Sequence, residues 1–87
     1  MGMRMQETSL TVFPNPTKGR VRVQIPENMG KNSILQVSNQ SGVIVLTQKV
    51  ISNYEYLDID LSRFKEGVYQ LSLRAGNIVR QGKIIKQ

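Results

Sequence analysis

The sequence contains no cysteine, no histidine and no tryptophan among its 87 residues. Without them the chain lacks a disulfide framework, a Cys/His zinc site, a thiol nucleophile and an imidazole base. We therefore expect no metal site and no cofactor, and a fold stabilised by packing and hydrogen bonds. A chain of this length forms a single domain with one core. The absence of cysteine does not decide the compartment, because extracellular proteins do not all contain disulfides.

Long hydrophobic runs are also missing, since the longest uninterrupted aliphatic run covers only residues 43–46. A bilayer-spanning helix needs roughly 20 apolar residues, so we expect no membrane insertion. The opening "MGMRMQETS" lacks the apolar centre of a secretory signal. We interpret residues 1–8 as a start added for expression or a linker remnant. Residues 9–87 then form the domain, taken from a longer chain with its own signal.

Acidic residues are outnumbered, with 6 Asp and Glu against 12 Lys and Arg and a net charge of +6. Such a balance favours anionic partners such as nucleic acid, anionic glycan or lipid headgroups. The charges are grouped along the sequence: Lys18, Arg20 and Arg22 near the front, Glu55, Asp58 and Asp60 in the middle, and Arg74, Arg80, Lys83 and Lys86 near the end. Because the solvent faces of strands normally carry charges, we favour a mixed solvent surface with basic ends over a dedicated polyanion site.

Alternation of apolar and polar residues, which is typical of half-buried strands, runs through almost the whole chain. It predicts strands at residues 10–12, 21–25, 33–39, 43–50, 54–61, 68–73 and 78–85. About seven short strands at this spacing indicate an all-β fold, an immunoglobulin-like antiparallel β-sandwich.

The segments between these strands contain turn residues. "NQSG" suits a turn between the third and fourth strands, and Gly76-Asn77 suits a tight hairpin with positive φ. Only 61–67, "LSRFKEG", has helical character, and it is long enough for one turn closed by Gly67. We expect its Leu61 and Phe64 to plug one end of the core, and we expect 26–32 to be a polar loop.

The stretch "VFPNPTKGRVRV" interrupts the alternation with two prolines. Proline has no backbone N–H and disfavours helix in the preceding residue, so Pro14 and Pro16 predict that the first strand ends at Phe13. The result is a rigid corner that also protects a sheet edge.

The remaining residues of this corner have their own expected roles. We expect the Asn15 side chain to bond backbone groups of Thr17 or Lys18, as asparagine does in local turns. Gly19 is expected to take a positive φ that turns the chain into the second strand.

The sequence of this stretch also resembles a known family motif. "LTVFPNPTKGRVRVQI" resembles the opening motif of the C-terminal sorting domain of the type IX secretion system. Further along, "QVSNQSGVIV", "DLSRFKEGVYQLSL" and "GKIIKQ" are similar to the later motifs of that family, in the same order, and together they cover nearly all of residues 9–87. There are two small departures: Phe13 replaces the usual Tyr, and Phe64 replaces a smaller aliphatic residue.

The resemblance implies a C-terminal sorting domain at residues 9–87 that does no chemistry. Such domains belong to Gram-negative bacteria and direct a cargo, fused on their N-terminal side, from the periplasm through an outer-membrane translocon to the cell surface or beyond. A surface sortase then removes the domain just before its first strand, here at or upstream of residues 5–9, and attaches the cargo to anionic lipopolysaccharide or releases it. The residues that match the family motif are Pro14, Asn15, Pro16, Gly19, Gly67, Tyr69, Lys83 and Lys86.

The resemblance places recognition at the terminal lysines. We expect Lys83 and Lys86 to keep their ammonium groups in water and to contribute little to stability. Of the two residues between them, one of Ile84 and Ile85 should face the core and the other a rim. In Gly67-Val68-Tyr69, glycine closes a turn and the tyrosine ring packs with its hydroxyl at the rim.

Two other classes of function remain open from the residues. An enzyme could use Asp58 and Asp60, which project from one face of a strand at i, i+2. Opposite Leu57, Ile59 and Leu61, however, they fit better as the solvent side of an amphipathic strand.

The second alternative is an appended binding module for carbohydrate or another anionic polymer, with Lys18, Arg20 and Arg22 as its face. Such sites usually interleave aromatic rings with charges, whereas Tyr54 and Tyr56 lie far along the sequence from this basic strand. We therefore expect no nucleic-acid partner. An exposed first or last strand could also promote a weak homodimer.

Overall fold

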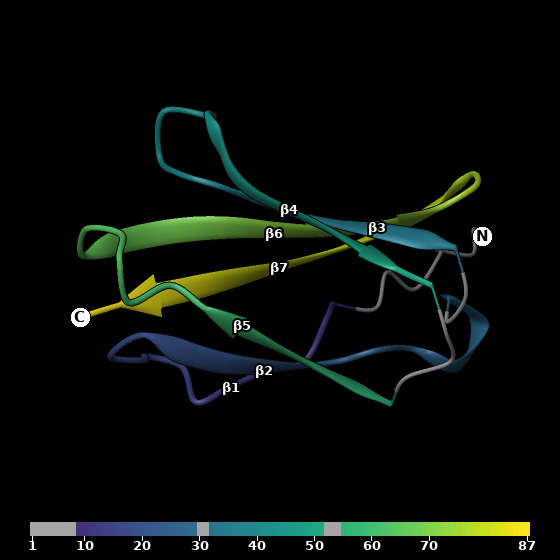
Figure 1. Ribbon diagram of the computed structural model, residues 1–87, viewed down its shortest axis with the longest axis horizontal. Coiled ribbons are helices and arrows are strands. Elements are labelled where there is room, and N and C mark those ends of the chain that lie inside the picture. The colour runs from purple at the N-terminus through teal and green to yellow at the C-terminus, as the bar shows by residue number, and fades with distance from the viewer. Residues whose placement is uncertain (1–8, 30–31, 52–54) are drawn as a thin grey trace, which may run out of the picture.

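The computed structural model describes residues 9–29, 32–51 and 55–87, which fold into a β-sandwich (Figure 1). Seven strands are formed by the described residues: β1 (Val12–Phe13), β2 (Arg20–Gln24), β3 (Ser33–Ser38), β4 (Ile44–Val50), β5 (Tyr56–Asp60), β6 (Gly67–Ala75) and β7 (Ile78–Lys86). The predicted all-β fold is confirmed, and each predicted strand is present within a few residues of its expected bounds. Tyr54 and residues 1–8 lie outside the described residues.

The strands form two antiparallel sheets. One sheet has three strands in the order β1-β2-β5, and the other has four in the order β4-β3-β6-β7. In Figure 1 the three-stranded sheet lies below and the four-stranded sheet above. The β1 ladder ends at Phe13, directly before Pro14, as the missing proline N–H predicts.

The core fills the space between the sheets, largely with alternate residues of β2, β3, β5 and β6. In β2, for example, Val21 and Val23 are buried while Arg20, Arg22 and Gln24 are exposed. Side chains with essentially no exposure come from both sheets and their connections: Val23, Leu35, Val37, Val50, Leu61, Leu71, Leu73 and Ile84. Burying each such side chain contributes about 1.5–3 kcal/mol, so this alternation is the main source of stability.

The connections follow the predicted turns, with one addition. Asn39 Oδ1 accepts bonds from the backbone N–H groups of Ser41 and Val43, and Gly76 has a φ of 63° in the β6–β7 hairpin, as expected. The predicted polar loop, however, contains a 3₁₀ turn at Glu27–Met29, and Met29 is only 1% exposed. Its burial was not predicted because a single helical turn produces no alternation.

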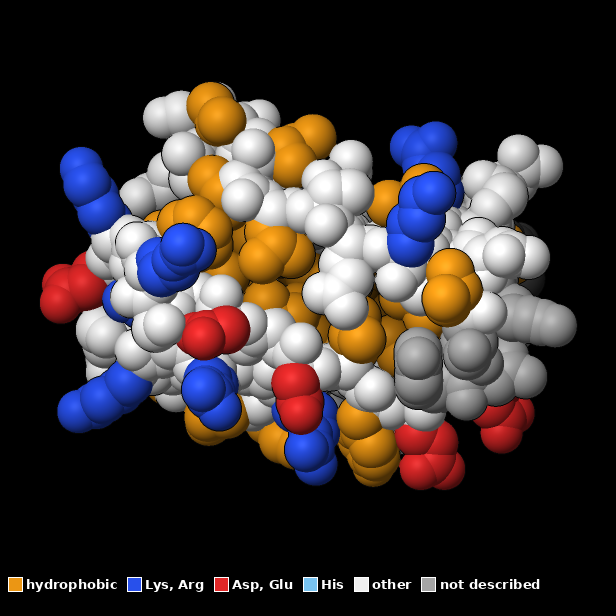
Figure 2. All heavy atoms as spheres, viewed as in Figure 1, with side chains coloured by type: hydrophobic (Ala, Val, Ile, Leu, Met, Phe, Trp, Pro, Cys, Tyr) orange, Lys and Arg blue, Asp and Glu red, His pale blue; other side chains and the backbone are white. Residues whose placement is uncertain are grey.

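One side of the sandwich is closed by the N-terminal segment. Leu10 donates its N–H to the carbonyl of Gln81 at 2.9 Å, and a β-carbon on Gly82 would lie 3.3 Å from Leu10 Cβ, so the segment before β1 runs against β7. On the opposite side β4 and β5 are both edge strands. Figure 2 shows hydrophobic side chains reaching the surface between the two sheets.

Candidate functional site

The residues of the predicted sorting motif gather at one end of the sandwich. Three segments meet there: 13–19 between β1 and β2, 61–69 between β5 and β6, and 83–87 at the end of β7. We call these three segments the motif end; it lies at the left of Figure 1, beside the C terminus. Residues far apart in the sequence are thus brought together, which the spacing alone did not show.

Asn15 joins the first of these segments to the last. Its Nδ2 donates to the carbonyl oxygen of Lys83 at 2.7 Å, and its Oδ1 accepts the N–H of Ile85 at 2.9 Å. The predicted bonds to Thr17 or Lys18 are therefore wrong. A side-chain amide has a carbonyl oxygen and N–H groups, as a peptide group does. Asn15 therefore bonds β7 through its side chain, whereas the neighbouring prolines have no backbone N–H to donate.

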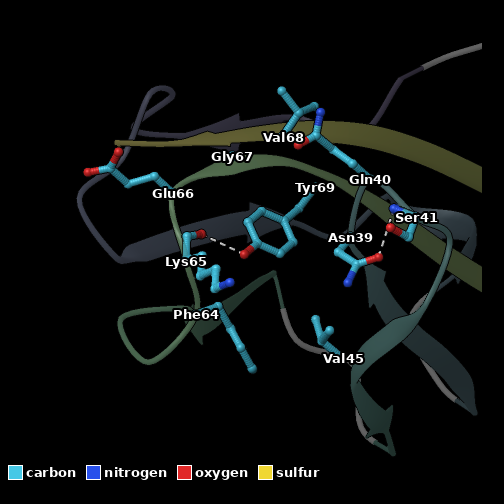
Figure 3. A pocket seen from close by; sticks show the side chains of 10 residues that line it. All are labelled: Asn39, Gln40, Ser41, Val45, Phe64, Lys65, Glu66, Gly67, Val68 and Tyr69. Carbon is cyan, nitrogen blue, oxygen red and sulfur yellow. Dashed lines mark hydrogen bonds between the residues drawn. The ribbon is translucent and has the colours of Figure 1, made fainter.

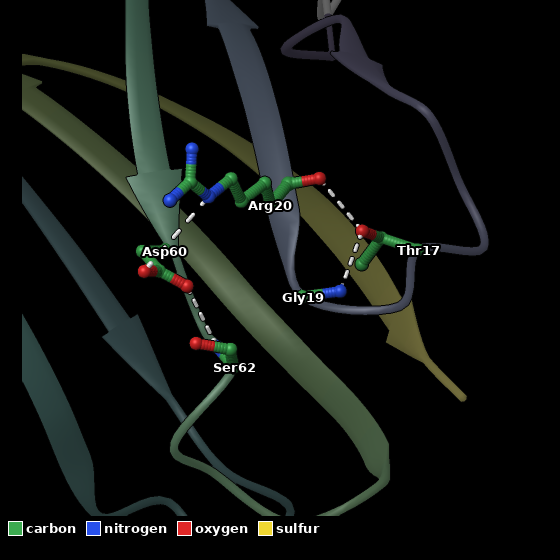
Figure 4. Close-up of polar contacts among 5 residues, drawn as sticks. All are labelled: Thr17, Gly19, Arg20, Asp60 and Ser62. Carbon is green, nitrogen blue, oxygen red and sulfur yellow. Dashed lines mark hydrogen bonds and ion pairs between the residues drawn. The ribbon is translucent and has the colours of Figure 1, made fainter.

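Thr17 continues this connection, and the sequence reasoning did not single it out. Its N–H donates to the carbonyl of Ile85 and its carbonyl accepts the N–H of Gln87, both at 2.8 Å, which forms a parallel bridge to β7. The hydroxyl donates to the carbonyl of Arg20 at 2.7 Å and accepts the N–H of Gly19 at 3.0 Å (Figure 4). With 3% exposure Thr17 is a buried polar residue with its groups satisfied. The available signal was a threonine placed between Pro16 and Gly19.

Gly19 has a different role from the predicted one. The glycines with positive φ among the described residues are Gly42, Gly67 and Gly76, so the expected positive φ at Gly19 is wrong. A β-carbon at Gly19 would instead lie 3.0 Å from Ser62 Cβ and 3.2 Å from Ser62 Cα. Glycine is needed here because the 13–19 and 61–69 segments approach closely, and the Gly19 carbonyl accepts the N–H of Leu61 at 2.7 Å.

Tyr69 and Gly67 occupy the expected positions at the start of β6. Tyr69 is 5% exposed, and its hydroxyl donates to the carbonyl of Lys65 at 2.6 Å at the rim of the core. Its ring packs against Phe64 with ring centroids 6.4 Å apart. Leu61 is fully buried and Phe64 packs against the core, so both plug this end as predicted.

A hollow of about 330 Å³ opens beside Tyr69, between the β3–β4 and β5–β6 turns (Figure 3). Its walls include Gln40, Phe64, Lys65 and Val68. Gly67 has a φ of 152°, a backbone conformation that favours glycine, and a β-carbon there would lie 3.3 Å from the end of the exposed Gln40 side chain.

The two terminal lysines differ in their surroundings. Lys83 is exposed, as predicted, but Lys86 is half-buried and its Nζ donates to the carbonyl of Phe64 at 2.9 Å. The expectation of a solvated Lys86 is wrong because β7 passes over the 61–69 turn, where an unpaired carbonyl needs a donor. Ile84 is fully buried and Ile85 is 39% exposed, which confirms the predicted alternation.

This arrangement can be compared with known protein families. A family model described as secretion system C-terminal sorting domain matches residues 11–87, which is most of the chain. The chain belongs to this family. No curated protein matches it. The sorting domain is therefore a C-terminal type IX secretion signal, which implies an N-terminal cargo, contact with the type IX machinery, and export to the cell surface or extracellular space.

The outer face of the three-stranded sheet of the sorting domain carries ion pairs. Arg22 contacts both carboxylate oxygens of Asp58, at 2.8 and 3.3 Å, and the guanidinium of Arg20 lies 4.0 Å from Asp60. The hydrogen bond from Arg22 lowers the pKa of Asp58, and hydrogen bonds from Ser62 lower the pKa of Asp60 (Figure 4). Both carboxylates are thus held ionised, unlike a general acid, whose pKa is raised.

Aromatic rings also lie on this face. Arg22 stacks over the Tyr56 ring at 5.6 Å, and the rings of Phe13 and Tyr56 meet edge to face with centroids 6.1 Å apart. The sequence separation of Tyr56 from the basic strand was therefore no guide to its position, because β5 pairs directly with β2. The two rings are nearly perpendicular, at 86°, so they do not form a flat platform.

Among residues 9–29, 32–51 and 55–87 there is no cluster of three or more His, Cys, Asp or Glu side chains that could hold a metal ion. Within the same residues no helix is long and apolar enough to cross a membrane.

Proposed function

We propose that the export machinery recognises the sorting domain at the motif end, through the motif residues that the fold leaves exposed. The observation that carries this proposal is the division within the motif. Gly19, Tyr69 and Lys86 are buried or half-buried and Asn15, although exposed, is bonded to β7, whereas Pro14, Pro16 and Lys83 are exposed. The first group builds the site and the second group is free to contact a partner.

The remaining steps are inferred from family membership. The domain itself catalyses no reaction and needs no cofactor. It crosses the periplasm folded, passes the outer-membrane translocon with its cargo, and is cleaved before β1 by a surface sortase. Its partners are then the translocon, the sortase and the cargo fused to its N-terminal side. Cleavage upstream of Leu10 would leave the core of the domain intact, because Leu10 is a core residue whose N–H bonds the carbonyl of Gln81.

The binding-module alternative is not supported. The family match points to sorting, and the basic face proposed for that alternative is largely neutralised, since Arg20 and Arg22 face Asp60 and Asp58. Lys18 alone of the three has no ion pair among the described residues.

The test is to fuse the full chain behind a signal peptide and a fluorescent reporter in a host with this secretion system. We expect the reporter on the cell surface or in the medium. Lys83→Ala should reduce delivery without changing the melting temperature, because an exposed lysine without an ion pair contributes little to stability. Arg20→Ala removes the same charge from the other sheet and should deliver normally. Wild-type reporter retained in the periplasm would contradict the sorting function, and equal delivery by both variants would contradict recognition at Lys83.

A further inference from the structure

The charges of the sorting domain are segregated between its two sheets. The three-stranded sheet carries Arg20, Arg22, Asp58 and Asp60, which sum to zero. The four-stranded sheet carries five cations and no acidic residue: Lys49, Arg74, Arg80, Lys83 and Lys86. The net positive charge of the strands therefore belongs to one sheet alone.

Three of these cations lie on the outer face of the four-stranded sheet. The register places Lys49 and Arg74 on either side of Ile34, and Lys83 opposite Gln70, and all three cations are exposed. Arg80 pairs with the buried Leu73 and so belongs to the other side of the sheet, and Lys86 is bound to the Phe64 carbonyl. We call Lys49, Arg74, Lys83 and the exposed residues between them the cationic face.

The cations of the cationic face form no ion pairs with the strands around them that would stabilise the fold. On the other sheet, cations and carboxylates sit directly opposite each other across β2 and β5. On the cationic face, Lys49 and Arg74 are roughly 10 Å apart, two strand spacings, with no carboxylate on the strands around them. None of the three cations has an ion pair within the described part of the chain, so their charge is available to a partner.

We propose that the cationic face is the docking surface for a carboxylate-rich protein surface of the type IX export machinery. Charge complementarity supplies the attraction and steers the encounter. The proposal rests on the proposed function and extends it, because Lys83 and the exposed Ile85 belong both to the motif end and to this face. The contact would thus run from the motif end along the outer side of β6 and β7 to Lys49 and Arg74.

The surrounding side chains favour a protein over an anionic glycan. Ile34, Val79 and Ile85 are about 40% exposed on this face. Ile34 lies between Lys49 and Arg74, Val79 pairs with Arg74, and Ile85 follows Lys83 by two residues on β7. Protein interfaces combine apolar area with charged groups in this way. Sugar and nucleotide sites instead use aromatic rings for stacking, and Tyr69, which is buried, is the only aromatic residue in β3, β4, β6 and β7.

The export assay tests this surface with a charge-matched pair of variants. Lys49→Glu with Arg74→Glu should lower delivery of the reporter by about tenfold or more, since like charges would then face each other across the contact. Arg20→Glu with Arg22→Glu changes the net charge equally on the exposed face of β2, outside both the motif end and the cationic face, and should deliver at the wild-type level. Lys83 is left unchanged in both variants because it belongs to the family motif.

Each result of this assay bears on a different proposal. Equal delivery by both variants, with melting temperatures near wild type, would overturn the cationic face while the sorting function stood. Equal loss in both would also overturn it, because the machinery would then sense net charge. If the first variant melts early, Lys49→Gln with Arg74→Gln replaces it and should still lower delivery. Failure of the wild-type reporter would instead contradict the proposed function.

The class of partner is tested by zero-length cross-linking. The full chain is mixed with outer-membrane vesicles from the same host and treated with a carbodiimide, which joins a lysine amine to a carboxylate in direct contact. We expect an amide between Lys49 and an Asp or Glu of an outer-membrane protein, identified by peptide mass spectrometry. Lys49→Arg keeps the charge but removes the amine, so it should lose the product and still be exported. A sugar adduct at Lys49, or no adduct, would overturn a protein partner.

Discussion

Asn15 shows how a single side chain substitutes for backbone pairing. Flanked by two prolines, it connects the end of β1 to β7 through both groups of its amide. Removing both bonds in Asn15→Ala should lower the free energy of unfolding by about 1–2 kcal/mol, measured by urea denaturation. Asn15→Asp keeps the acceptor for Ile85 but places a carboxylate oxygen against the Lys83 carbonyl in place of the donor, so it should also lower the free energy of unfolding near neutral pH. Asn77→Ala, in the exposed β6–β7 turn, is the control, and a loss there equal to that of Asn15→Ala would contradict the bridge.

At Gly19 the close approach of Ser62 leaves no space for a side chain. A β-carbon in Gly19→Ala would meet Ser62 Cβ at 3.0 Å, and such overpacking costs about 1–3 kcal/mol. Adding Ser62→Gly should restore part of the loss, because it removes the Ser62 β-carbon but leaves the backbone α-carbon 3.2 Å away. A double-mutant cycle in urea measures this coupling, and strict additivity would show that the two segments do not press against each other. Gly42→Ala, with a φ of 85° and open space, isolates the cost of backbone strain alone.

At the scale of the element, the positions of the strands could be predicted from the sequence, but the pairing of each strand with its neighbours in the sheet could not. Alternation located β2 through β7 because a half-buried strand shows its own pattern locally. The partners of Asn15 and Tyr56 depend on which strands lie side by side, and that is decided by packing between distant segments. For the same reason, the ion pairs of Arg20 and Arg22 with carboxylates of β5 were not predicted. The role of Gly19 could not be predicted because two different conditions favour glycine: a positive φ and the close approach of another segment. The sequence shows the glycine but not which condition applies.

The β2–β5 pair should give the sorting domain an acid-sensitive contribution to stability. Asp58 has its pKa lowered by the hydrogen bond from Arg22, so its ionised form is favoured in the folded state. This stabilisation is complete above the ordinary pKa of 3.8 and is lost as the pH falls through the lower folded value. Urea denaturation from pH 6 to pH 2 should therefore show a smaller acid-induced loss in Asp58→Asn than in wild type. Glu55→Gln, at an exposed position outside the ion pairs, should keep the wild-type slope, and identical profiles for all three would exclude the effect.

For the whole molecule, stability and sorting are expected to depend on different sides of the same strand. Ile84→Ala empties a fully buried site and should cost about 2–5 kcal/mol of the free energy of unfolding. Ile85→Ala removes a 39% exposed side chain and should change stability by no more than about 0.5 kcal/mol. The same substitution should nevertheless reduce reporter delivery, because Ile85 lies where the motif end meets the cationic face. Normal delivery of Ile85→Ala would show that recognition does not reach this residue.

The closure of the sandwich by β7 also has a consequence for the order in which the protein is made. The side chain of Asn15 and the backbone of Thr17 bond residues 83–87, which leave the ribosome long after the Pro-Asn-Pro stretch. A nascent chain, or a fragment that stops before residue 83, holds the front half of the motif without the strand that organises it. If the machinery recognises the motif end as proposed, a chain that stops before residue 83 should therefore not be exported.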